Sequence, residues 1–288
     1  MPIRVHIGGR ICPPEEAKVS VFDRGFLYGD SVYETIGTAH GKLFAARDHL
    51  DRLQRSAERI GLRTPPRAEI ERAIAETIAA AGFPESRVRV ILTRGAGKLD
   101  LDPASTDDPQ LIVMVFPLGA PTAEMYEKGV AVAIVSITRN SPSSLDPMVK
   151  SGNYLNNVLA LGEARRRSKA YEAILCGGDG SVAEGSTSNV FVVIGGEVRT
   201  PPPEVGILDG ITRAKAIGLC REAGIPFAER RITPDELRGA DEVFITSATR
   251  GVLPVTTIDE KPVAGGTPGP VTRRLMGLYD ALARRGVD

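Results

Sequence analysis

The sequence predicts a mixed α/β (α+β) fold in two domains, and three observations support this prediction. At 288 residues the chain is longer than one typical domain. Apolar patterns with the period of a strand and with the period of a helix alternate along it. Many of the strand-like runs are joined by short glycine turns, which favours hairpins and mixed sheets over one doubly wound parallel sheet.

The first domain is predicted at residues 1–119, as an N-terminal α/β domain. Its predicted strands are residues 3–7, 18–22, 32–38, 88–93 and 111–116. Apolar residues three or four positions apart predict a helix over residues 47–61 and a second helix after Pro65-Pro66.

The second domain is predicted at residues 120–288, as a C-terminal α/β domain that contains Lys150. Its predicted strands are residues 130–137, 171–176, 181–185, 189–194, 226–232, 242–248 and 252–258. Its predicted helices are residues 154–168, which we expect to be buried, 211–223, a helix that begins after Thr233, and 271–285. Thr233 is followed by proline and, three residues on, by Glu236, which is the pattern of a capped helix start.

Charge and cysteine content exclude several classes of protein. Thirty-six basic residues balance thirty-six acidic ones, so the chain lacks the basic surface typical of a nucleic-acid binder. Cys12, Cys176 and Cys220 are widely spaced and odd in number, which indicates neither a disulfide framework nor a CxxC pair. The N-terminus lacks a signal-peptide pattern, and no run approaches the roughly 18 apolar residues of a membrane span. We therefore expect a cytoplasmic protein without a membrane partner.

Three common catalytic motifs are also excluded. RGAGK at residues 94–98 lacks the earlier glycine and the final Ser or Thr of a phosphate-binding loop. The three histidines do not form HExxH, and no GxSxG occurs. No metal site is expected.

Lys150 is the first candidate for chemistry, because it follows two apolar residues and precedes a small, flexible Ser-Gly pair. A lysine at the edge of a buried segment usually extends its ammonium group to solvent. A desolvated lysine amine has a lowered pKa instead and can attack a carbonyl carbon. The position of Lys150 alone does not decide between these interpretations.

Other candidate residues suggest what this amine serves. Glu184 ends a predicted strand, either as a solvated turn residue or as a carboxylate that keeps a pyridine nitrogen protonated. Gly210, Ile211 and Thr212 begin a predicted helix, whose free N–H groups can bind a phosphate. Arg52, on the predicted helix 47–61, could add a bidentate cation. Together with a reactive lysine, these groups describe a pyridoxal phosphate site.

Seven stretches then make a family resemblance visible. They are FDRGFLYGDSVYET, HLDRLQRSAERIGL, LTRGAGKLDLDP, KSGNYLNNVLA, EAILCGGDGSVAEGSTSNVF, LDGITR and DEVFITSATRGVLPV, which run in this order from about residue 22 to 257. The chain resembles the class IV aminotransferases, the fold-type IV pyridoxal phosphate enzymes. These include branched-chain aminotransferases, D-amino acid aminotransferases and aminodeoxychorismate lyases. The resemblance implies the two-domain D-amino acid aminotransferase-like fold.

The resemblance also implies roles for particular residues. Lys150 would bind the cofactor covalently and, once released, move a proton between the substrate Cα and the cofactor. Glu184 would pair with the pyridine nitrogen. Glu34 and His49 match an acid and a histidine of the family pattern and would support the site without catalysing, or would form only a structural pair, which is the interpretation we prefer. The other implied cofactor contacts are Arg52, Tyr154, Leu208, Gly210, Ile211, Thr212, Ser247, Ala248 and Thr249. Family members are homodimers with active sites at the domain junction that borrow a loop from the partner, so we expect a homodimer with a shared active site.

The substrate is less clear from the resemblance. Leu99-Asp100-Leu101 stands where D-amino acid aminotransferases have Arg-x-His, whereas the loop spacing and Tyr28 are similar to branched-chain enzymes. However, Gly37 stands where the branched-chain strand has an arginine. Arg250-Gly251 stands where the family more often has a small residue followed by glutamate. The candidate substrate residues are Tyr28, Tyr33, Arg94, Lys98 and Arg250. Arg250 could bind a substrate carboxylate or could equally form only a structural ion pair.

We expect a transaminase that moves an amino group between an aliphatic, branched-chain L-amino acid and a 2-oxo acid such as 2-oxoglutarate. Two alternatives follow in order: a transaminase of D-amino acids or (R)-amines, and an aminodeoxychorismate lyase. A protein that keeps the fold and binds pyridoxal phosphate without turnover is a fourth possibility, which Lys150 and Glu184 argue against.

Overall fold

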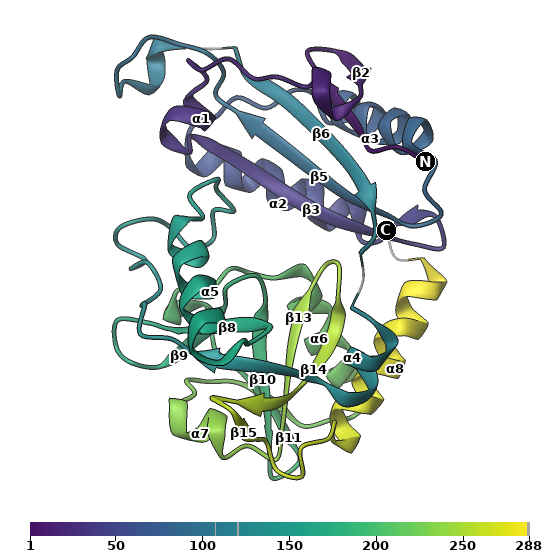
Figure 1. The fold of residues 1–288 in the computed structure, drawn as a ribbon, viewed down its shortest axis with the longest axis vertical. Coiled ribbons are helices and arrows are strands. Elements are labelled where there is room, and N and C mark those ends of the chain that lie inside the picture. Colours follow the sequence, from purple (N-terminus) through teal and green to yellow (C-terminus); the bar gives the residue numbers. More distant parts are fainter. Residues whose placement is uncertain (107, 120, 287–288) are drawn as a thin grey trace. The chain divides into compact units, whose positions relative to one another are not determined.

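The computed structural model describes residues 1–106, 108–119 and 121–286, and its contacts divide the chain into two compact units. The first unit comprises Met1–Gly119 and Val149–Asn153, and the second comprises Ala120–Met148 and Tyr154–Arg285. Both units combine sheet and helix (Figure 1), which confirms the predicted fold class.

The segment around Lys150 lies in the first unit, whereas the sequence assigned it to the C-terminal domain. Its backbone is held by the strand Ser31–Ala39 (β3): the Tyr33 N–H donates to the Lys150 carbonyl at 2.9 Å, and Ser151 forms a bridge with Val32. The position of Lys150 is thus set by a pairing that spans more than a hundred residues, and no local pattern reveals it.

The first unit is built on a six-stranded sheet whose pairings are antiparallel, in the order β2-β1-β6-β5-β3-β4. These strands are β1 (Arg4–Ile7), β2 (Arg10–Cys12), β3, β4 (Lys42–Leu43), β5 (Ser86–Thr93) and β6 (Gln110–Pro117). Two helices, α2 (Ala46–Arg59) and α3 (Arg67–Ala81), pack against one face. Leu53 and Ile74 from these helices meet Val88 and Val113 from the strands, and this cluster is the core of the unit.

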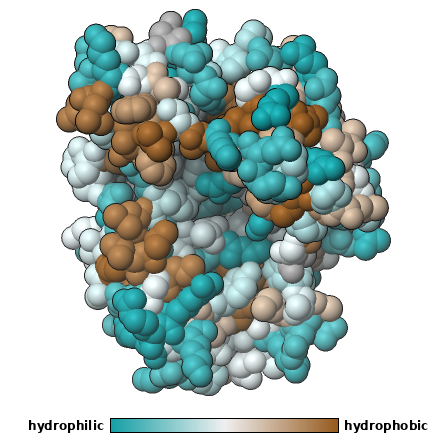
Figure 2. Space-filling view, turned by 45° about the horizontal axis from the view of Figure 1, so that its top comes forward, coloured by the Kyte–Doolittle hydropathy of each residue, from teal (hydrophilic) through white to brown (hydrophobic). Residues whose placement is uncertain are grey.

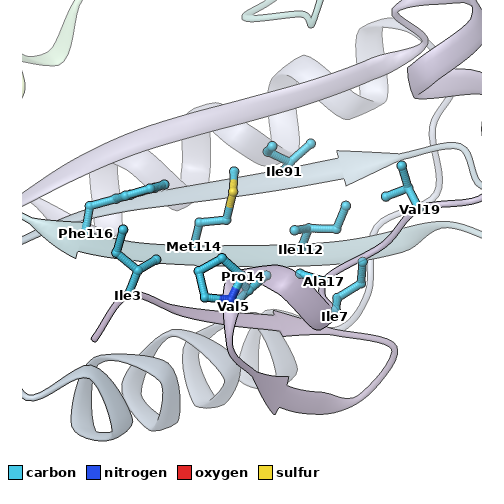
Figure 3. A pocket seen from close by; sticks show the side chains of 10 residues that line it. All are labelled: Ile3, Val5, Ile7, Pro14, Ala17, Val19, Ile91, Ile112, Met114 and Phe116. Atoms are coloured by element: carbon cyan, nitrogen blue, oxygen red, sulfur yellow. The ribbon is translucent and has the colours of Figure 1, made fainter. Parts of the chain in front are cut away.

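The opposite face of this sheet carries an apolar pocket (Figure 3). It is lined by Ile3, Val5, Ile7, Pro14, Ala17, Val19, Ile91, Ile112, Met114 and Phe116. None of these side chains titrates or acts as a nucleophile, so the pocket is not the place where this chain does chemistry.

The strand predicted at residues 18–22 is wrong. These residues form no β-ladder with another strand, and Val21 and Phe22 are exposed to solvent. Their alternating apolar pattern matches a strand, but strand formation also needs a neighbouring strand with free backbone groups. The short elements near this segment are η1 (Pro14–Glu16), α1 (Arg24–Tyr28) and, further along, η2 (Pro103–Ser105).

The second unit contains a nine-stranded mixed sheet, in the order β12-β11-β10-β13-β14-β7-β8-β9 with β15 beside β14. Its strands are β7 (Val130–Ile134), β8 (Glu172–Cys176), β9 (Val182–Gly185), β10 (Asn189–Ile194), β11 (Glu197–Thr200), β12 (Phe227–Glu229), β13 (Glu242–Ser247), β14 (Gly251–Ile258) and β15 (Lys261–Pro262). β7 pairs in parallel with β14 and β8, and β11 pairs in parallel with β12. The strands predicted at 130–137 and 226–232 therefore form, but each ends earlier than predicted.

The helices of the second unit are α4 (Ala123–Lys128), α5 (Leu155–Ser168), η3 (Pro203–Val205), α6 (Ile211–Glu222), α7 (Pro234–Arg238) and α8 (Pro270–Arg285). The predicted cap of α7 is present, because Thr233 Oγ1 accepts from the Glu236 N–H at 3.1 Å and Glu236 accepts from the Thr233 N–H at 2.9 Å. Within the described ranges, no helix has the length and apolarity needed to cross a membrane.

The expectation that α5 is buried is wrong for one of its faces. Leu155, Val158 and Leu159 are exposed, while Ala160 and Ala164 pack into the unit. Apolar residues therefore occur on both sides of this helix, and the sequence pattern alone does not tell which side faces solvent. Figure 2 shows that exposed apolar side chains gather in separate patches on one face of the molecule.

Candidate active site

Lys150 lies beside an aromatic ring and a second cation in the first unit. Its Nζ is 4.6 Å from the centroid of the Tyr33 ring, and the Arg89 guanidinium carbon is 3.8 Å from the same centroid. The register of β3 and β5 places Thr35 opposite Arg89, so Arg89 and Tyr33 are diagonal neighbours on one face of the sheet. Among the described residues, Arg89 forms no ion pair that neutralises it. This face can therefore attract an anionic substrate group.

Arg52 is held by a buried carboxylate. Its Nε donates to Glu34 Oε1 at 2.6 Å and its Nη2 to Oε2 at 2.8 Å, while His49 Nδ1 lies 2.7 Å from Oε2. Burial raises the pKa of Glu34, but Arg52 and His49 lower it more, so the pKa lies well below its ordinary value. Glu34 is thus an anion that fixes the orientation of the arginine predicted to bind phosphate.

Arg94, a predicted substrate residue, has its guanidinium group hydrogen-bonded to other residues of the protein. It donates to Asp30 at 2.7 and 3.0 Å and to the carbonyls of Ile60 and Gly61 at 2.8 Å. These bonds use four of the five guanidinium N–H groups, so only one N–H group remains to bind a substrate. Arg24 also binds Asp30, and although burial raises the pKa of Asp30, the two arginines lower it below its ordinary value.

The two other candidates in this part of the chain are Tyr28 and Lys98. Tyr28 is half-buried at the end of α1, where the Arg24 guanidinium lies 5.2 Å from its ring centroid. Lys98 is exposed in the loop between β5 and β6. Nothing in their surroundings assigns either of them to a substrate.

Glu184 is buried at the end of β9 and surrounded by donors. Its Oε2 accepts from the Leu208 N–H at 3.0 Å and from Asn189 Nδ2 at 3.3 Å. Arg139 Nε lies 2.9 Å from Oε1, which is an ion pair by distance although the N–H is not aligned for a hydrogen bond. The carboxylate is therefore held in place by two hydrogen bonds and a neighbouring cation. Sequence analysis missed Arg139 and Asn189, and the polar start of the otherwise apolar β10 run was the available signal for Asn189.

The first turn of α6 is open to an anion. Its N-cap, Gly210, has an extended backbone and no side-chain cap, so the first N–H groups, including those of Ile211 and Thr212, have no partner within the helix. A Cβ at Gly210 would lie 1.9 Å from Asn189 Oδ1, so a side chain at this position would have to displace the Asn189 amide. Thr246 Oγ1, on the strand position opposite Asn189, is buried without a hydrogen-bond partner in the described part of the chain. This environment suits a polar ligand.

The turn Ser247–Thr249 is fixed by Arg250, the last predicted substrate residue. Arg250 Nε donates to Ser247 Oγ at 2.7 Å, Nη1 to Glu172 at 2.9 Å, and Nη2 to the carbonyl and hydroxyl of Thr187 at 2.8 and 2.7 Å. These contacts favour the interpretation of Arg250 as one side of a structural ion pair. Ala248 lies in the same turn, and both of its neighbours are half-buried.

Leu208 and Tyr154 complete the predicted cofactor residues. The Leu208 backbone binds Glu184, and its carbonyl accepts from Asn189 at 3.0 Å. Tyr154 is the N-cap residue of α5 and is half-buried.

The residues of each unit suit a different part of pyridoxal phosphate. The first unit offers an amine and two arginines. The second offers a buried carboxylate that can accept a ring N–H, and a helix start that can donate to a phosphate. No cluster of His, Cys, Asp and Glu suited to a metal occurs in the described ranges.

A lysine amine, a buried carboxylate and an uncapped helix start are the kinds of groups that enzymes use to hold a cofactor and act on amino or carbonyl groups. A family model described as amino-transferase class IV matches residues 31–258. The chain belongs to the class IV aminotransferases, a family of pyridoxal-phosphate-dependent enzymes.

Three known proteins illustrate the similarity. The D-alanine aminotransferase of Bacillus licheniformis is 37% identical over 274 residues, which cover 95% of this chain and 94% of that protein. The branched-chain aminotransferase of the thermophilic archaeon Thermoproteus uzoniensis, solved with norvaline, has a TM-score of 0.90 and 34% identity, with 98% of this chain and 95% of that chain covered. The branched-chain amino acid aminotransferase of Escherichia coli has a TM-score of 0.90 and 31% identity, with 96% of this chain and 94% of that chain covered.

A further solved branched-chain amino acid aminotransferase carries pyridoxamine 5'-phosphate. Its TM-score is 0.91 and its identity is 34%, with 98% of this chain and 94% of that chain covered.

Proposed function

We propose that the protein binds pyridoxal phosphate and transfers an amino group between an aliphatic, branched-chain L-amino acid and 2-oxoglutarate. The observation that carries the choice of acceptor is the Arg89 guanidinium 3.8 Å from the Tyr33 ring, which Lys150 Nζ also contacts at 4.6 Å. An arginine with no ion-pair partner in the described chain suits the second carboxylate of a dicarboxylic acceptor. The family name of the solved neighbours supports the branched-chain donor.

Each of these residues would have a separate role in the reaction. When bound, pyridoxal phosphate withdraws electrons from the substrate Cα and carries the amino group between the two substrates. Lys150 binds the cofactor and moves the proton at Cα, because its amine is the nucleophile on this face. Glu184 keeps a proton on the ring nitrogen. Arg52, the amides of Ile211 and Thr212, and the Ser247–Thr249 turn bind the phosphate.

The second candidate function is a transaminase of D-amino acids or (R)-amines, which the similarity to a D-alanine aminotransferase favours. Against it, the loop has Leu99-Asp100-Leu101 and therefore offers no arginine or histidine at these positions. An aminodeoxychorismate lyase comes third.

We also propose that the protein is a homodimer with a shared active site and works in the cytoplasm. The exposed apolar residues Leu155, Val158 and Leu159 on α5, and Phe22 and Phe26 near α1, support assembly, because a monomer seldom leaves such groups in water.

The proposed function predicts a visible absorption band for the purified protein after pyridoxal phosphate is added. L-leucine should bleach this band, whereas D-alanine and (R)-1-phenylethylamine should leave it unchanged. Bleaching by D-alanine alone would instead select the second function, and pyruvate release from aminodeoxychorismate without any amino acceptor would select the lyase. A protein that never develops the band would contradict the cofactor assignment.

Arg89→Met tests the acceptor. We expect the KM for 2-oxoglutarate to rise about 10- to 100-fold, because a charged hydrogen bond of about 1.5–3 kcal/mol is lost. The KM for pyruvate, which lacks the second carboxylate, should change much less. The matched control is Arg87→Met, two residues earlier on β5, where the guanidinium stacks on Phe116 at 5.1 Å. Equal KM increases for both acceptors would show that Arg89 does not read the second carboxylate.

A further inference from the structure

Arg250 joins three segments of the second unit through its guanidinium group. Its Nε donates to Ser247 Oγ at 2.7 Å, across a turn in which the Arg250 N–H also donates to the Ser247 carbonyl at 3.2 Å. Nη1 donates to Glu172, at the start of β8, at 2.9 Å. Nη2 donates to the carbonyl and hydroxyl of Thr187, between β9 and β10, at 2.8 and 2.7 Å. The guanidinium is therefore held on every side by a different part of the unit.

The ion pair between Arg250 and Glu172 is buried. The side chain of Arg250 is 11% exposed and that of Glu172 is 2% exposed. The Glu172 carboxylate also accepts hydrogen bonds from the hydroxyls of Ser186, Thr187 and Ser188, so it is fixed from several directions. A guanidinium group is planar and rigid. Fixing Nη1 and Nη2 therefore also fixes the direction in which the Nε–H bond points.

The hydrogen bond from Arg250 gives the Ser247 hydroxyl a direction. A guanidinium group can only donate, so Ser247 Oγ is the acceptor in this bond. A hydroxyl has a single proton, which must then point away from the arginine. Within the described part of the chain, the half-buried Ser247 hydroxyl donates to no other group. Its proton is therefore available to an anion beside the turn.

We propose that Arg250, held by Glu172 and Thr187, is a positioning residue that orients the Ser247 hydroxyl to donate its proton to the cofactor phosphate. This inference rests on the proposed function, in which the Ser247–Thr249 turn binds the phosphate of pyridoxal phosphate. Arg250 itself touches neither substrate nor cofactor in this proposal. It acts through Ser247, and the buried ion pair with Glu172 keeps it in the orientation that this requires.

Arg250→Lys separates this role from a structural ion pair, because lysine keeps a positive charge for Glu172 but has no donor at the Nε position. Cofactor-free wild type and variant are titrated with pyridoxal phosphate and with pyridoxal, and the visible band gives each dissociation constant. We expect Arg250→Lys to bind pyridoxal phosphate about tenfold more weakly and pyridoxal as well as wild type does, since the serine proton is no longer directed at the phosphate. The matched control is Arg238→Lys, whose Nε donates to Asp259 at 3.0 Å and which should leave both constants unchanged.

Two further variants show whether Arg250 acts through Ser247. Ser247→Ala should cause the same phosphate-selective loss, and Arg250→Lys should add nothing to it in the Ser247→Ala background, because both changes act on one hydrogen bond. Thr187→Val keeps the ion pair but removes the hydroxyl that accepts from Nη2, and it should cause a smaller loss of the same kind. This variant carries the test if Arg250→Lys folds poorly.

The possible outcomes separate this inference from the proposed function. Equal loss of affinity for both ligands, or no loss in any of the variants, would overturn the positioning role. A further loss from Arg250→Lys in the Ser247→Ala background would also overturn it, because the arginine would then contact the phosphate itself. Wild type that binds neither ligand would overturn the proposed function, and this inference with it.

Discussion

Lys150→Ala is expected to abolish transamination, with a loss of at least about 10⁴-fold in turnover, the upper end of what a positioned acid–base group contributes. The loss should reach this size because the same amine binds the cofactor and moves the substrate proton. The fold should survive, since the segment is held to β3 by its backbone: the Lys150 carbonyl accepts from Tyr33 and its N–H donates to Ser56 Oγ. Multiple-turnover assays and the visible band are measured on the same preparation.

The control for Lys150→Ala is Lys42→Ala, which removes an exposed lysine on β4 and should leave turnover unchanged. Added methylamine offers a second control, because a small free amine can replace part of the proton transfer in the alanine variant. Turnover of Lys150→Ala at the rate of wild type would contradict the assignment of the base.

Arg52→Met is expected to give the largest loss of stability, about 3–5 kcal/mol in the free energy of unfolding, because it leaves the Glu34 carboxylate buried without its cation. Glu34 is 0% exposed and holds Arg52 through two hydrogen bonds of 2.6 and 2.8 Å. Urea unfolding of the cofactor-free protein separates this effect from phosphate binding. The control is Arg67→Met, because the half-exposed pair between Arg67 and Asp51 should contribute only about 0–1 kcal/mol.

The pair of Arg52 and Glu34 makes the free energy of unfolding depend on pH, with less stability in acid. Because the pKa of Glu34 is lowered in the folded protein, its contribution is complete above the unfolded pKa of about 4.3 and is lost as the pH falls below that value. Wild type should therefore lose stability in acid. The variant with both Glu34→Gln and Arg52→Met should recover part of the stability that Arg52→Met loses, and a double variant no more stable than the single one would argue against an uncompensated charge.

Local periodicity predicted most of the elements correctly, and its failures share a cause. The helix over residues 47–61 and the strand over residues 32–38 were recognisable because the apolar spacing matches one face of each. Residues 18–22 alternate like a strand but find no partner strand, and α5 has apolar residues on both sides. In both cases the apolar pattern shows which side chains a segment could bury. Whether another segment lies there to cover them depends on the rest of the fold.

The proposed chemistry of the site could be inferred from the sequence, because it depends on residue types at short spacing. The sequence alone pointed to Lys150 before Ser-Gly, to Glu184 at the end of a strand and to Gly210 at the start of a helix. Only the tertiary structure shows which of the candidate arginines are bound within the protein. Arg94 and Arg250 are bound to Asp30 and Glu172, residues 64 and 78 positions away, while Arg89 stacks on Tyr33. Hydrogen bonds are directional and short, so their partners follow from strand register and packing between distant segments, which a local pattern does not contain.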